Sequence, residues 1–185
     1  MKMSHADTRR WESARTLADI GQLTALWLEG QIKSQPGYEP GWGPDTETLP
    51  LVPTLAALCR AGYVTTNSQP GESGRGADGR WYEQKAAAEG FVSDPGLYRR
   101  LVTAAGSAGL TVAGGTQVIV TTCNGRPYTA FGGVLGARDM QAQWSVLNRG
   151  AFAELTSAMP LTIAAPEYGE AGQRMWRVLS SMVGR

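Results

Sequence analysis

The spacing of apolar residues along the chain predicts alternating helices and short strands. Apolar residues recur at every third or fourth position across residues 11–29, which predicts an amphipathic helix that ends at Gly30. A second helix is expected to end at Gly62, with regular structure starting only near Pro53 because Pro50 and Pro53 interrupt its start. The remaining predicted elements are paired strands at 63–66 and 81–93, a helix at 94–105, strands at 110–113, 117–123 and 127–131, helices at 138–148 and 151–158, a strand at 161–164 and a helix at 173–182.

Glycine-rich and proline-rich stretches separate these elements. Residues 31–44 are an irregular connection that can be a lid or a plain surface loop, and residues 67–80 are expected to form a mobile loop. Asn124-Gly125 predicts a tight hairpin turn, and the polar residues 1–10 are expected to be a flexible N-terminal tail. The predicted fold class is therefore α/β (mixed α+β). Residues 11–185 are expected to form a single domain whose mostly antiparallel or mixed sheets are flanked by about five helices.

Composition and charge exclude several classes of function. The 185-residue chain is 42% apolar with a net charge of +1 and no basic stripe, so neither nucleic acid nor a membrane is expected as a partner. The single histidine, His5, and the two cysteines, Cys59 and Cys123, lack metal-ligand spacing, so no metal is expected. No signal peptide and no membrane-spanning run is recognised, which favours a cytoplasmic protein.

The stretch from Glu47 to Pro70 contains the most specific pattern in the chain. It begins with Glu47-Thr48-Leu49, continues through about a dozen helical residues to Gly62 and Thr65, and ends with Asn67-Ser68-Gln69-Pro70. Later matching positions are Gln84-Lys85-Ala86, Glu89 and Phe91, with weaker agreement at Trp27-Leu28-Glu29-Gly30, Ala151-Phe152 and Trp176. Together these residues resemble the C-terminal regulatory domain of eukaryotic methylenetetrahydrofolate reductase, over nearly the whole chain.

The resemblance implies that the chain binds S-adenosylmethionine or S-adenosylhomocysteine. The positions that match the family's ligand-binding residues are Glu47, Thr48, Thr65, Ser68 and Thr129. A further threonine of the family falls near residues 137–140, where this chain has none, and this leaves the relative affinity for the two ligands open.

The chemistry of these residues is compatible with such a ligand. The hydroxyls of Thr48 and Ser68 can donate and accept hydrogen bonds, and the Glu47 carboxylate favours an ammonium group or a nearby sulfonium. From the residues alone, helix capping explains Glu47 and Thr48, strand propensity explains Thr65, and turn chemistry explains residues 67–70. Gln84, Lys85 and Glu89 are expected either on a solvated strand face or as support for the loop at 67–80.

Three functional hypotheses follow. The first is a stand-alone sensor or regulatory module for the adenosyl ligand. In that family a flavin-binding barrel carries out the reduction, and because this chain lacks the barrel, we do not expect it to be a reductase or to bind flavin. The second is a small-molecule methyltransferase that uses S-adenosylmethionine, with residues 31–44 and 71–80 as walls of the acceptor pocket and Asp78, Tyr82 or Glu83 as acceptor-side groups. The third is an interaction domain whose ligand site is disused. Catalytic residues, the methyl acceptor and the oligomeric state stay open.

Overall fold

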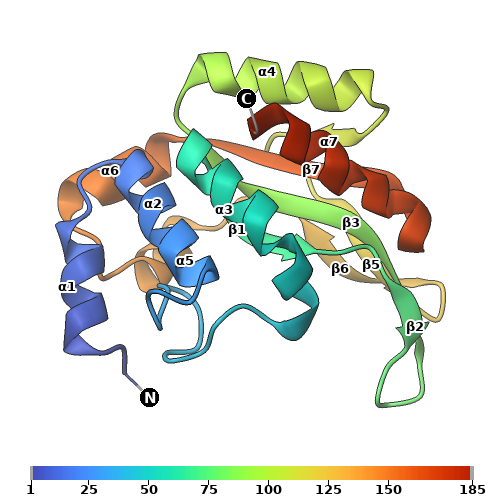
Figure 1. Ribbon diagram of the computed structural model, residues 1–185, viewed down its shortest axis with the longest axis horizontal. Coiled ribbons are helices and arrows are strands. Elements are labelled where there is room, and N and C mark those ends of the chain that lie inside the picture. Colours follow the sequence, from blue (N-terminus) through green and yellow to red (C-terminus); the bar gives the residue numbers. More distant parts are fainter. Residues whose placement is uncertain (1, 184–185) are drawn as a thin grey trace.

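Strand β3 (Trp81–Val92) is the centre of the fold (Figure 1). In the computed structural model, which describes residues 2–183, β3 pairs with β2 (Ser73–Arg75) and β5 (Val118–Cys123) along its first half. Its second half pairs with β1 (Tyr63–Gln69) and β7 (Met159–Tyr168). Strand β6 (Arg126–Phe131) extends the sheet beyond β5, and β4 (Thr111–Ala113) extends it beyond β7. Every pairing among these strands is antiparallel. The predicted pairing of β1 with β3 and the predicted hairpin at Asn124-Gly125, which joins β5 to β6, are confirmed.

One face of the sheet is covered by α3 (Val52–Ala61), α4 (Pro95–Ser107) and α7 (Arg174–Val183). Figure 1 shows α4 and α7 lying over β3 and β7. The main hydrophobic core lies in this layer, because Ala86 and Ala88 point into it from β3 together with Leu161 and Ile163 from β7. Alternate side chains along the same strands point to the other face, as the period of two requires.

The other face is packed against α5 (Ala137–Gln143) and α6 (Arg149–Ser157). Helix α2 (Leu17–Leu28) lies beside α3 and contributes side chains to both cores. A second core joins Ile20 of α2, Val64 of β1 and Leu155 of α6. The mixed α+β class is confirmed, but the described residues contain seven α-helices where about five were expected. Six helices were predicted by position, and the additional one is the N-terminal α1. Helix α5 ends at Gln143, well before the predicted 148.

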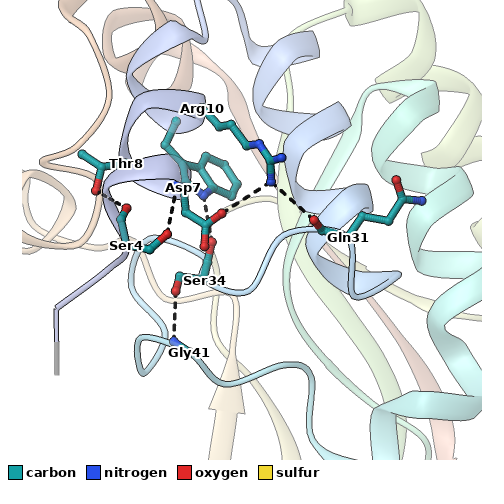
Figure 2. Close-up of polar contacts among 8 residues, drawn as sticks. Ser4, Asp7, Thr8, Arg10, Gln31, Ser34 and Gly41 are labelled. Carbon is teal, nitrogen blue, oxygen red and sulfur yellow. Dashed lines mark hydrogen bonds and ion pairs between the residues drawn. The ribbon is translucent and has the colours of Figure 1, made fainter.

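The N-terminal segment is helical from His5 onward, so the prediction of a flexible tail is wrong for residues 5–10, whereas residue 1 lies outside the described residues. Helix α1 spans His5–Ser13, and the Ser4 hydroxyl caps it by accepting from the Asp7 N–H at 3.1 Å. Trp11 is fully buried and its indole Nε1–H donates to the Ser34 carbonyl at 2.8 Å. The Ser34 hydroxyl in turn accepts from the Gly41 N–H at 2.9 Å (Figure 2). Helix α1 therefore fixes the connection at residues 31–44.

The segment expected as a mobile loop at residues 67–80 contains strand at 67–69 and 73–75. β1 continues through Gln69, with a bulge between Thr65 and Asn67, and β2 follows from Ser73. Gln69 is buried, and its amide Nε2–H donates to the carbonyls of Lys85 and Val120 at 2.9 and 2.8 Å. A polar side chain that is fully hydrogen-bonded can lie inside a sheet, and sequence polarity alone does not reveal such bonds.

Candidate functional site

Two segments bring the predicted site residues together. The lead-in to α3 is a 3₁₀ helix, η1 (Thr46–Leu51), so the prediction of an irregular start before Pro53 is confirmed. Helix α3 ends at Gly62, whose φ of 101° is the left-handed conformation expected for a glycine stop. The chain then turns directly into β1, and this places η1 beside β1.

A small recess lies between η1, β1 and α2, and we call it the recess. It has a volume of about 70 Å³, and Thr48, Thr65 and Ser68 all line it. Thr48 and Thr65 are buried, with exposed fractions of 8% and 6%. Three of the five residues predicted from the sequence therefore share one site. The Thr65 hydroxyl is already hydrogen-bonded to the Cys59 thiol at 3.2 Å, and burial raises the pKa of that thiol, so Cys59 is an uncharged structural partner.

Two further residues of the recess were not predicted from the sequence. Thr24 of α2 and Gln35 of the 31–44 connection line the recess and are 1% and 5% exposed. Within the described chain, the Thr24 hydroxyl and the Gln35 side-chain oxygen have no hydrogen-bond partner. Buried polar atoms are nearly always paired with protein or water, so the two unpaired atoms mark positions in the recess where a bound group can supply a partner. In the sequence, only the position of Thr24 on the apolar face of the first predicted helix indicated this part of the recess.

A larger cavity adjoins the recess, and we call it the large cavity. It has a volume of about 670 Å³ and lies between the sheet and the α5–α6 side of the molecule. Thr66 and Asn67, at the β1 bulge, line both spaces. The apolar wall of the large cavity includes Phe91, Met140, Trp144, Leu155 and Pro160. Trp144 is 1% exposed and its indole Nε1 also has no partner among the described residues.

Glu89 is the one charged side chain among the described residues that line the large cavity. Its carboxylate accepts from the Asn67 side-chain amide at 2.6 Å and from the Gly132 N–H at 2.5 Å. In the recess, the one charged lining residue is Asp45. Among residues 2–183, no lysine, arginine or histidine lines either space, so the charge that these residues give the combined site is negative.

Glu47 and Thr129 lie outside these walls. The Glu47 carboxylate accepts from the Gln84 side-chain amide at 3.5 Å, and burial, together with the carboxylates of Asp45 and Glu72, raises its pKa. Thr129 is on β6, paired with Thr121, and its neighbour Ala130 lines the large cavity. Ala137 and Met140 also line the large cavity, so the segment where the family's threonine is missing faces the same space.

Gln84, Lys85 and Glu89 were expected either on a solvated strand face or as support for the loop at 67–80. Gln84 holds Glu47 as described, and the Lys85 ammonium lies 5.0 Å from the centre of the Tyr168 ring. Glu89 alone of the three lines a cavity, through its bonds to β1 and to Gly132.

The proposed acceptor-side groups lie away from both spaces. The Tyr82 hydroxyl donates to Asp78 at 2.9 Å, and Glu83 accepts from the Thr122 hydroxyl at 3.3 Å. Residues 31–44 contribute to the recess wall, whereas residues 71–80 contribute to neither wall.

Comparison with known proteins places the chain in a family. A family model described as "Domain of unknown function (DUF6919)" matches residues 6–184. None of the curated proteins compared with the chain matches it. Among the described residues, no group of three metal-ligating side chains comes together, and no helix has the length and apolar character needed to cross a membrane.

Proposed function

The chain belongs to the DUF6919 family, whose description states no activity, and we propose from its site that it binds S-adenosylmethionine or S-adenosylhomocysteine as a stand-alone sensor or regulatory module. One observation supports this most strongly. Thr48, Thr65 and Ser68, which match the ligand residues of the reductase regulatory domain, line one recess together with two unpaired buried polar groups.

The sizes of the two spaces suggest how the ligand lies. The recess of about 70 Å³ is too small for an adenosyl ligand, whereas 670 Å³ falls within the range of about 300–1,000 Å³ typical of small-molecule sites. We propose that a polar end of the ligand enters the recess and that the rest passes Thr66 and Asn67 into the large cavity. Ala130, Ala137 and Met140 then lie along its path. Ala130 is next to Thr129, and the other two residues belong to the segment where the family has a further threonine.

The donor and acceptor groups suit this placement. The Gln35 side-chain oxygen can accept from an amino, ammonium or ribose hydroxyl group, and the hydroxyls of Thr24, Thr48 and Ser68 can donate to a carboxylate or a ring nitrogen. The apolar side chains of the large cavity provide area for the purine ring and the methyl-bearing sulfur.

Calorimetric titration with both ligands tests the proposal directly. We expect at least one of them to bind with a dissociation constant in the micromolar range. If both bind only more weakly than about 1 mM, equivalent to about −4 kcal/mol, the proposal is wrong.

Thr48→Val tests whether the recess is the site. Removing a buried hydroxyl that pairs with the ligand should weaken binding by about 1–3 kcal/mol, as measured by the same titration. Thr111→Val on β4, which lines neither space, is the matched control and should leave the affinity unchanged. Equal affinity of the Thr48 variant and the native protein would place the ligand elsewhere.

A small-molecule methyltransferase is the second candidate, and the position of Glu89 favours it. A carboxylate in the wall of the ligand cavity can orient a nucleophile or accept its proton. Formation of S-adenosylhomocysteine from S-adenosylmethionine and a small-molecule cell extract would support this candidate. The absence of any product above the protein-free rate, with S-adenosylmethionine bound, would favour the sensor.

A further inference from the structure

We infer that the site selects for positive charge, and that Glu89 makes it prefer S-adenosylmethionine, which carries a sulfonium, over the uncharged thioether of S-adenosylhomocysteine. This inference rests on the proposed function and assigns the ligand class that the resemblance leaves open.

The charges that line the site are of one sign. Asp45 lines the recess and Glu89 lines the large cavity, and no basic side chain of the part of the chain that the structure describes lines either space. A carboxylate in a partly enclosed site, where the effective dielectric constant is about 20, interacts with a nearby charge about four times as strongly as it would in water. Ligands with a net positive charge are therefore favoured, and phosphate-rich adenosine ligands find no cation to neutralise them.

Glu89 is held in a fixed orientation before any ligand binds. Its two carboxylate oxygens accept from the Asn67 amide and the Gly132 N–H, at 2.6 and 2.5 Å, and each oxygen retains a free lone pair. The Gly132 backbone is itself confined, because a Cβ there would lie 2.4 Å from the Thr116 carbonyl oxygen and its φ is +87°. A pre-oriented carboxylate loses little entropy when a cation binds beside it.

The wall around Glu89 suits a soft cation that carries methyl groups. Phe91 and Trp144 line the same cavity, and aromatic rings attract cations through their negative faces. Leu155 and Met140 give the cavity an apolar surface, which favours the methyl group of a sulfonium over a hydrated metal ion. An aromatic wall with a single carboxylate is a composition typical of sites for organic cations.

Three ligands that share adenosine but differ in charge test the inference. In calorimetric titrations of the native protein, S-adenosylmethionine should bind about 10- to 100-fold more tightly than S-adenosylhomocysteine, and ATP should not bind below 1 mM. Glu89→Gln should weaken S-adenosylmethionine binding by about 10- to 100-fold and change S-adenosylhomocysteine binding by less than about threefold. Glu83→Gln is the matched control on the same strand, outside both spaces, and should change neither affinity.

Particular outcomes overturn the inference. The inference is wrong if the native protein binds S-adenosylhomocysteine as tightly as S-adenosylmethionine. It is also wrong if ATP binds with an affinity comparable to that of either ligand. A Glu89→Gln variant that loses both ligands equally would show a structural role for Glu89. If that variant does not fold, as judged by its thermal melt, the ratio of the dissociation constants of S-adenosylhomocysteine and S-adenosylmethionine for the native protein decides. Failure of the proposed function has a different signature, because neither adenosyl ligand would then bind the native protein.

Discussion

The buried hydroxyl of Thr24 has a cost to the fold that a ligand bound at the proposed site would relieve. Its hydroxyl is buried on α2 and has no hydrogen-bond partner in the described chain. Leaving a buried polar group unpaired costs about 1–3 kcal/mol. Natural proteins retain such a group where binding requires it, since a ligand can supply the missing partner.

Thr24→Val should therefore change stability and binding in opposite directions. We expect the free energy of unfolding of the ligand-free protein to rise by about 1 kcal/mol, and the affinity for the adenosyl ligand to fall by about 1–3 kcal/mol. Urea unfolding and calorimetric titration measure the two effects. Thr103→Val, at an exposed position of α4, is the control and should change each by less than about 0.5 kcal/mol. A variant that lost stability without losing affinity would contradict the assignment.

Glu47 gives the protein a specific dependence on pH. Burial raises the pKa of its carboxyl above the ordinary 4.5, so the folded state binds the proton more tightly than the unfolded state does. The associated stability is fully present below about pH 4.5 and is lost as the pH rises through the raised pKa. Glu47→Gln should remove this loss, raising the free energy of unfolding at pH 7 by less than about 1 kcal/mol, because solvent screens a partly exposed charge. Unfolding curves at pH 4 and pH 7 would refute this if the variant and the native protein lost stability equally.

At the scale of residues, the sequence was sufficient to predict part of the recess. The structure brings Thr48, Thr65 and Ser68 to one recess, although what they bind stays a prediction. Thr24 and Gln35 were missed because unpaired polar atoms are a property of packing, which no local pattern reports.

At the scale of elements, α1 determines the shape of the recess although it does not line it. Its Trp11 holds Ser34, and Ser34 holds Gly41, so the segment that contains Gln35 is fixed at both ends (Figure 2). Polar composition suggested a tail, because only Trp11 and Asp7 of α1 are buried and two residues do not produce a recognisable period.

Trp11→Phe should consequently weaken both folding and ligand binding. The variant keeps the aromatic packing but leaves the Ser34 carbonyl without its donor, which should lower the free energy of unfolding by about 1–3 kcal/mol. The dissociation constant should rise as well, since Gln35 becomes less well ordered. Trp42→Phe is the matched control, because the Trp42 side chain is 63% exposed. Identical melting temperatures for the two variants would contradict this role.

At the scale of the whole molecule, the periodicity of apolar residues was sufficient to predict the fold class but not the order of the strands in the sheet. The mixed α+β class, the β1–β3 pairing and the hairpin at Asn124-Gly125 follow from local patterns. The pairing of β3 with β7 does not, since three helices and three strands separate them along the chain. The large cavity, which is bounded by elements from β1 to β7, could not be located without that pairing.

The central position of β3 also constrains how the chain reaches its native state. A growing or refolding chain that lacks β7 leaves the second half of β3 with β1 as its only neighbour, and the Ala86–Ala88 row without the Leu161 and Ile163 side chains that cover it. Contacts between such distant segments slow folding, and exposed strand edges promote aggregation in the interval. Once formed, β3 can open only when both of its sides are released. Its amide hydrogens should therefore exchange with solvent only through global unfolding, as native-state hydrogen exchange would measure, while those of α1 exchange through smaller openings.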